Sequence, residues 1–185
     1  AASEEYDSTT GSTENVEKVQ DTSRKLIKNV DMSVETEEFD KLLAYVEKRI
    51  EALGGYIETS NVYNGSTYKA AGNLRTANIT ARIPAERLNE FLSLVSEASN
   101  VISKNESVTD VTLQYVDMQS HKDALQTEQQ RLLELLEQAE TIDDIITIES
   151  RLSDVRYQIE SMESQLRTFD NQVSYSTVYL YIDEV

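Results

Sequence analysis

The stretch IITIESRLSDVRYQIESMESQLRTFDNQV, residues 145–173, decides the fold. Its large apolar side chains alternate spacings of three and four residues over four heptads without a slip. Such a seven-residue rhythm places them along one side of a helix and is typical of a left-handed coiled coil. The predicted seam consists of Ile145, Ile148, Leu152, Val155, Ile159, Met162, Leu166, Phe169 and Val173.

A partner for this seam lies immediately upstream, in residues 113–139. Apolar residues recur there every seven positions, with two further leucines near the end: Met118, Leu125, Leu132 and Ala139, then Leu135 and Leu136. In the short AETIDD segment that follows, Thr141 with Asp144 resembles a capping box and predicts a helix start. A short connection makes successive helices antiparallel. We therefore expect a helical hairpin with legs of about 40 and 48 Å.

Polar side chains interrupt the inner side of the first leg. Lys122 and Gln129 fall at inward positions in one register, and His121 and Glu128 in the other. We interpret them as side chains that reach solvent from the edge of a two-helix seam. The alternative is that the second leg faces another copy of the chain in a four-helix assembly.

The first half contains a repeat. Residues 29–48 and 78–97 align without a gap at an offset of 49, and the apolar period changes from 2 to 3.6 at the same place in both copies. A strand therefore runs into a helix, which begins near Thr36 and near Pro84. A second strand follows each helix, with Ile57 matching Ile102 at an offset of 45, so the second helix is predicted to be one turn shorter. Gly54-Gly55 is interpreted as a helix stop.

Two tandem βαβ units predict a four-stranded, ferredoxin-like sheet with both helices on one face. Residues 64–73 would form a hairpin-type loop. Alternation returns in residues 174–182, which we expect to rejoin the sheet as a fifth strand. The predicted fold is therefore α+β, with a sheet domain in residues 23–110 and 172–185 and an inserted antiparallel coiled-coil hairpin in residues 111–171. Residues 1–22 are rich in Ser, Thr and Glu and are expected to form a disordered leader.

The last strand has two different faces. Val178, Leu180 and Ile182 alternate with a second row that contains three tyrosines: Tyr175, Tyr179 and Tyr181. These tyrosines form either an interaction surface or a half-buried row packed under a helix or loop.

Composition excludes several kinds of site. The chain has 34 acidic and 17 basic residues, and its net charge of −17 repels nucleic acid and anionic lipid. Without cysteine, and with His121 as the single histidine, thiolate and multi-histidine metal sites are excluded. No G-x-S-x-G motif accompanies His121, so a hydrolase that uses His121 or Ser176 is a minor alternative. We expect no cofactor, no metal site and no catalytic residue, and no stretch is apolar enough to span a bilayer.

Five segments resemble, in this order, domain-of-unknown-function family 4349 of bacterial envelope proteins: GGYIETSNV, ARIPAERLNEFL, YVDM, residues 131–166 and NQVSYSTVYLYI. The resemblance covers residues 24–182. It implies an exported protein, often a lipoprotein, that is anchored to the bacterial membrane with its folded part outside. The chain has no lipid-acceptor cysteine and no C-terminal apolar span, so we expect it to be trimmed at both ends. Lys122 departs from the apolar residue that members carry, and the resemblance supplies no catalytic residues.

The expected function is a non-catalytic extracytoplasmic module of a membrane-anchored surface protein. Its hairpin would act as a spacer or docking arm, through a protein partner or self-association. The alternative is a sensor domain that binds a small molecule or peptide at the sheet.

Overall fold

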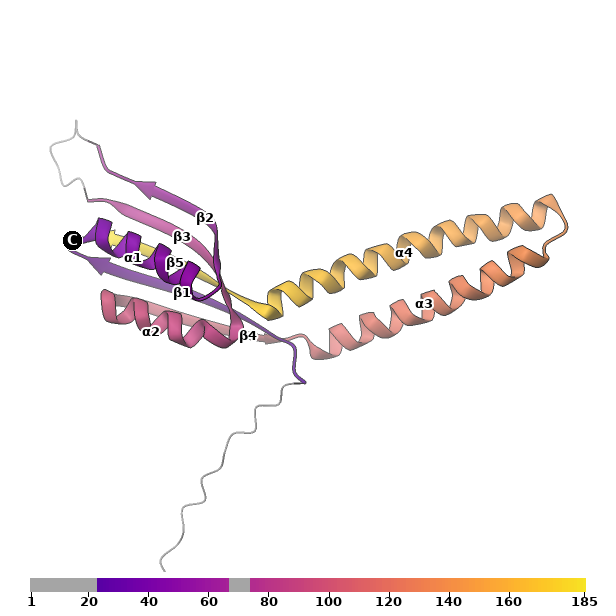
Figure 1. The fold of residues 1–185 in the computed structure, drawn as a ribbon, viewed down its shortest axis with the longest axis horizontal. Helices are drawn as coiled ribbons and strands as arrows, with labels where there is room; N and C mark the ends of the chain where they lie inside the picture. The colour runs from indigo at the N-terminus through magenta and orange to yellow at the C-terminus, as the bar shows by residue number, and fades with distance from the viewer. Residues whose placement is uncertain (1–22, 67–73) are drawn as a thin grey trace, which may run out of the picture.

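The computed structural model describes residues 23–66 and 74–185. It is an α+β structure in which two long helices project from one end of a five-stranded mixed sheet (Figure 1). The predicted leader, residues 1–22, and residues 67–73 of the predicted loop lie outside the described residues. None of the described helices combines the length and apolarity needed to cross a membrane.

Nine main elements follow one another in the order that the sequence predicts. They are β1 (Leu26–Thr36), α1 (Phe39–Ala52), β2 (Tyr56–Tyr63), β3 (Thr76–Pro84), α2 (Leu88–Ala98), β4 (Asn100–Asp110), α3 (Thr112–Gln138), α4 (Ile142–Ser174) and β5 (Tyr175–Glu184), with a short 3-10 turn, η1 (Ala85–Arg87), before α2. The 14 residues of α1 and the 11 of α2 confirm that the second helix is shorter.

The strand order is β2-β3-β5-β1-β4. The pair β1–β5 is parallel, and all other neighbours are antiparallel. The last strand therefore rejoins the sheet as predicted. It does so in the middle, between the first strands of the two repeats, because its apolar row is as fully buried as theirs.

The core lies between one face of the sheet and the two short helices. Alternate residues of β1, β3 and β5 contribute one side of it, and the apolar faces of α1 and α2 contribute the other. Its largest fully buried side chains are Phe39, Phe91, Met32, Ile50, Ile79, Ile83, Leu180 and Ile182. This packing confirms the repeat, because equivalent positions of both copies are buried together.

The helix stop at the end of α1 is a Schellman motif. Gly54 has a φ of +80° and donates its N–H to the Glu51 carbonyl, while the Gly55 N–H bonds to the Ile50 carbonyl. A Cβ on Gly55 would lie 2.5 Å from the carbonyl oxygen of Arg82, so the chain passes close to β3 here.

One detail of the repeat differs from the prediction. Ile57 packs partly against the core, but its expected counterpart Ile102 is exposed and Val101 packs there instead. The cause is a register shift between β1 and β4: Ser33 pairs with Ser103, whereas Val34 pairs with Val101. The extra residue in β4 turns Ile102 away from the core.

An ion-pair cluster closes the end of the sheet that lies away from the long helices. Arg75 bonds to both carboxylate oxygens of Glu184, at 3.0 and 2.6 Å, and to Asp40 at 2.8 Å, with its guanidinium over the Phe39 ring. The hydrogen bonds from Arg75 lower the pKa of Glu184 from its ordinary 4.5 to about 2.

The two long helices leave the sheet from β4 and β5, which lie on either side of β1. Two strand spacings amount to about 9.6 Å, which falls within the usual distance of about 8–10 Å between packed helix axes. The helices can therefore pack together without bending. The start of β1 lies at this entrance, where the Lys25 N–H bonds to the Thr112 hydroxyl and the Lys25 ammonium lies over the Tyr115 ring.

Candidate functional site

The hairpin, formed by α3, α4 and the connection between them, has an apolar cluster between its legs, and the coiled-coil seam along the rest of its length stays a prediction. All twelve seam residues chosen from the sequence are buried or half-buried in the structure: Ile145, Ile148, Leu152, Val155, Ile159, Met162, Leu166, Phe169, Met118, Leu125, Leu132 and Leu136. The tightest cluster is Leu125 with Val155 and Ile159. Lys122 and Gln129 are half-buried beside the seam, whereas His121 is exposed.

Polar contacts fix the two legs in antiparallel register. The Arg151 guanidinium donates two hydrogen bonds to the Glu128 carboxylate, at 2.7 and 3.1 Å, and lowers the pKa of Glu128. Near the sheet, the Tyr115 hydroxyl donates to the Asp170 carboxylate at 2.8 Å, which raises the pKa of Tyr115. At the far end, Thr141 is the N-cap of α4 and accepts from the Asp144 N–H at 3.2 Å, as predicted.

The tip of the hairpin carries apolar side chains that its own packing leaves uncovered. Ile142 is 75% exposed and Ile146 is 59% exposed, and Leu133 and Leu135 are also exposed. The prediction that Leu135 fills the seam with Leu136 is therefore wrong, because the Leu135 side chain lies on the solvent side of α3. No basic residue occurs between Arg131 and Arg151, and this stretch contains six acidic residues. Five of them lie at or near the connection between the helices: Glu134, Glu137, Glu140, Asp143 and Asp144. We call the four apolar residues and these acids the tip.

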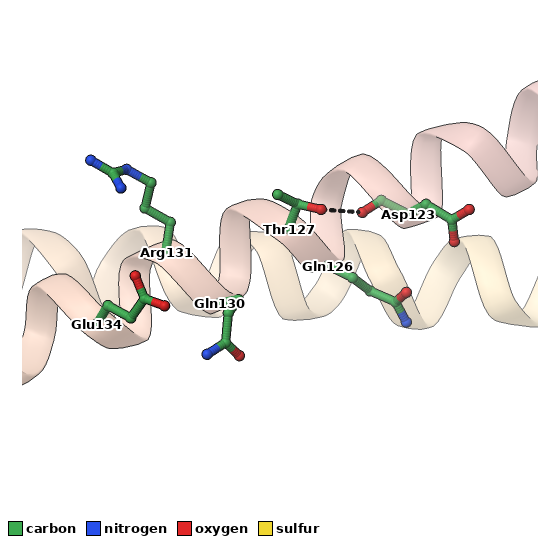
Figure 2. A pocket seen from close by; sticks show the side chains of 6 residues that line it. All are labelled: Asp123, Gln126, Thr127, Gln130, Arg131 and Glu134. Carbon is green, nitrogen blue, oxygen red and sulfur yellow. Dashed lines mark hydrogen bonds between the residues drawn. The ribbon is translucent and has the colours of Figure 1, made fainter.

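A shallow hollow on the outer surface of α3 does not form a site. Figure 2 shows that the six side chains around it all come from α3 and spread along the helix instead of converging. The hydrogen bond drawn among them runs from the Thr127 hydroxyl to the Asp123 carbonyl of the same helix, at 3.1 Å. Such a surface offers a ligand no enclosed volume.

Arg82 joins the hairpin to the sheet. This β3 side chain is 8% exposed and donates to the Thr177 hydroxyl on β5 and to the side-chain and main-chain oxygens of Asn171 on α4. The Asn171 carbonyl is one of the last four of α4, where the helix dipole favours a cation. Arg82 therefore acts as a C-terminal cap for α4, and we call Arg82, Thr177 and Asn171 the junction.

A hollow of about 420 Å³ lies beside the junction. Its lining comes from the sheet and from the last turns of α4: Tyr56, Glu58, Arg82, Ser164, Arg167, Thr168, Asn171 and Gln172. The Tyr56 ring meets Tyr175 edge to face, with centroids 5.7 Å apart. This arrangement places polar groups of the sheet and of the arm around one opening.

The tyrosine row of β5 lies on the face of the sheet opposite the core. Tyr179 is 38% exposed and Tyr181 is 44% exposed, whereas Tyr175 is half-buried against Tyr56. The structure thus leaves two of the three predicted surface tyrosines open to solvent.

The residues considered for catalysis are not brought together. His121 is exposed on α3, while Ser176 is buried in β5 with a hydroxyl that has no hydrogen-bond partner among the described residues. Asp143 and Asp144 occupy the first turn of α4, and the described residues contain no acidic or histidine cluster that could hold a metal ion.

Sequence reasoning missed the junction and the tip. Arg82 follows the alternation of β3 and reads as an ordinary outward residue, but the end of α4 accepts two of its hydrogen bonds and helps to bury it. The sequence does contain a sign that the tip is exposed, because Ile142 and Ile146 lie beside the heptad seam rather than on it.

Comparison with known proteins gives one match. A family model described as "Domain of unknown function (DUF4349)" matches residues 24–185. No curated protein and no solved structure matches the chain.

Proposed function

Because the chain belongs to the DUF4349 family, whose description assigns no activity, we propose a function from its own geometry. The protein is a non-catalytic docking module. Its sheet, a ferredoxin-like unit with β5 inserted, serves as the base, and its hairpin, an antiparallel coiled coil, is an arm that presents the tip to a protein partner.

The exposure of the tip is the observation that carries this proposal. A hairpin that only separated two domains would gain from polar residues at its end, since exposed Ile and Leu side chains favour association. The acidic residues around Ile142 and Ile146 favour a partner with an apolar groove bordered by Lys and Arg.

The reach of the arm follows from helix geometry. The 33 residues of α4 extend about 50 Å at 1.5 Å per residue. Two packed helices, cross-linked by Arg151 with Glu128 and fixed to the sheet by Arg82, hold the tip away from the base more firmly than an unstructured linker would.

Site-specific cross-linking in cells tests the docking function. A photo-reactive amino acid at position 140, in the tip, should give a discrete protein adduct, whereas the same group at position 97, on α2, should not. Replacing Ile142 and Ile146 by Ser should remove the adduct without unfolding the chain. Equal adducts from both positions, or an adduct that survives the double substitution, would contradict the proposal.

The family resemblance supports an extracytoplasmic location, with the protein anchored to the bacterial membrane. The test is protease treatment of intact cells that express the full-length gene product. Cleavage of the sheet and hairpin without cell lysis is expected, and full protection together with recovery from the cytosolic fraction would refute the location.

The hollow at the junction favours a second candidate, a sensor. A ligand bound between Tyr56, Arg82 and Arg167 would touch both the sheet and α4, so binding would change how the arm sits on its base. Thermal-shift screening of small anions and peptides tests this candidate: a stabilising ligand whose effect disappears in Arg167→Met supports it, and no ligand-dependent shift refutes it.

A further inference from the structure

The edge strand β4 is open to solvent along most of its length. Every residue from Ile102 to Asp110 is exposed, and β4 pairs with β1 alone among the described strands. Protein edges are usually protected by proline, by bulges or by charged residues. β4 contains no proline, and its bulge lies at one end, beside Val101.

The free backbone groups of this edge can be assigned. The Val111 N–H bonds to the Lys25 carbonyl, while the Lys25 N–H bonds to the Thr112 hydroxyl, so one hydrogen bond marks residues 25 and 111 as a hydrogen-bonded pair position at the end of the β1–β4 ladder. Such pairs alternate in an antiparallel ladder, and the register is unbroken from Asp110 to Ser103. Lys104, Glu106 and Val108 therefore direct their N–H and C=O groups away from β1, toward a side on which no described strand is their neighbour.

We propose that the neighbour is the β4 strand of a second copy of this chain, paired antiparallel about a two-fold axis at Asn105. In this register, Lys104 lies opposite the partner's Glu106, and Glu106 lies opposite the partner's Lys104. The outward backbone groups of these residues then meet as hydrogen-bonded pairs, and two five-stranded sheets become one continuous sheet of ten strands.

Charge selects this register. An axis at position 104 or 106 places two like charges directly opposite each other, which destabilises a strand pair. An axis at position 107 pairs Lys104 with the partner's Asp110 but leaves Glu106 opposite the partner's Val108. Lys104 and Glu106 already form an ion pair within one strand, with Nζ and Oε1 3.4 Å apart, and only the axis at Asn105 also gives each of them an opposite charge on the partner strand. A lysine on an edge normally repels a second copy, but Glu106, two residues further on, makes this edge complementary to itself.

The same edge also carries an exposed apolar side chain. Val108 is 58% exposed, although it belongs to a strand beside the core. A hollow between Lys104 and α2 leaves room beside the edge, and its α2 lining consists of Asn89, Leu92, Ser93, Ser96 and Glu97.

This dimer places the two arms far apart. Because the paired strands are antiparallel, the hairpins project from opposite ends of the ten-stranded sheet, and the two tips are free. Dimerisation through β4 therefore leaves the proposed docking function intact. Dimerisation rests on residues of β4 and docking rests on residues of the tip, so an experiment can refute one without refuting the other.

Charge-reversal variants of the full chain, measured by sedimentation equilibrium up to high micromolar concentration, test the proposal. The wild type is expected to dimerise reversibly. Lys104→Glu or Glu106→Lys alone should raise the dissociation constant by about tenfold, because two attractive pairs become repulsive. The double variant should restore dimerisation, because the swapped charges pair again.

Matched controls separate this effect from net charge and from misfolding. Lys48→Glu and Glu47→Lys make the same charge changes on the exposed side of α1 and should leave the dissociation constant unchanged. Circular dichroism confirms that each variant is folded. A monomeric wild type overturns the proposal. So do single variants that dimerise as the wild type does, as association through the hairpin would produce, and a double variant that stays monomeric.

Discussion

Replacing Arg82 by Met should weaken the attachment of the hairpin to the sheet and lower the free energy of unfolding by about 2 kcal/mol. The Thr177 hydroxyl that accepts from Arg82 is in a residue only 6% exposed, so water cannot readily replace the lost donor. A hydrogen bond to a charged group contributes about 1.5–3 kcal/mol, and leaving its buried acceptor without a donor costs most of that amount. Asn171 is exposed and can be rehydrated, so its two bonds add little.

A double-mutant cycle with Thr177→Val isolates the contact. Each single variant should lose about 2 kcal/mol in urea denaturation followed by circular dichroism. The double variant should lose clearly less than both losses together, with a coupling energy of about 1.5 kcal/mol, because no buried acceptor is left unpaired. Arg167→Met, a nearby exposed arginine on α4, is the control and should change stability by less than about 0.5 kcal/mol. Strictly additive losses would refute the reasoning.

Arg82→Met should also widen the range of positions that the hairpin adopts relative to the sheet. The chain contains no cysteine, so cysteines introduced at exposed positions 97 and 140 can be spin-labelled selectively. We expect a single narrow distance distribution between base and tip in the parent, and a broader one in Arg82→Met. An unchanged distribution would mean that the seam alone sets the direction of the arm.

Three further predictions concern the sheet. Folded Glu184 has a pKa of about 2, below its ordinary 4.5, so the stability that it contributes with Arg75 is complete above pH 4.5 and is lost as the pH falls toward 2; Glu184→Gln should flatten this part of a stability–pH curve. Ser176→Ala removes a buried hydroxyl without a partner and should stabilise the protein by about 1 kcal/mol in urea denaturation, and a loss of stability would indicate a hidden hydrogen bond. Gly55→Ala places a Cβ against the Arg82 carbonyl oxygen and should lower the thermal midpoint by several degrees, because a backbone clash forces the chain to shift; an unchanged midpoint would refute the close approach.

Local patterns allowed the elements to be predicted from the sequence. The change of period at Thr36 and at Pro84 marked two strand-to-helix transitions, and the heptads of residues 145–173 marked the second long helix. Thr141 marked the start of α4 because a helix N-terminus needs a side-chain acceptor within its first turn. In each of these places the signal lies within a few residues of the structure that it specifies.

The arrangement of the sheet depends on long-range pairing and was only partly predictable. The alternation of β5 requires a buried face, but many neighbours satisfy that requirement, so the position between β1 and β3 could not be read from it. Arg82 shows the same limit at one residue, since its burial results in part from α4, which lies about 90 residues away in the chain. Ile102 was misassigned because a single extra residue in β4 reverses which side chain faces the core.

The central place of β5 has a consequence for how the chain folds. In the finished sheet β5 separates β1 from β3, the first strands of the two repeats, so these two strands never pair with each other. The hairpin connects β4 to β5 on the two sides of β1, so its formation shortens the loop that must close when β5 pairs with β1.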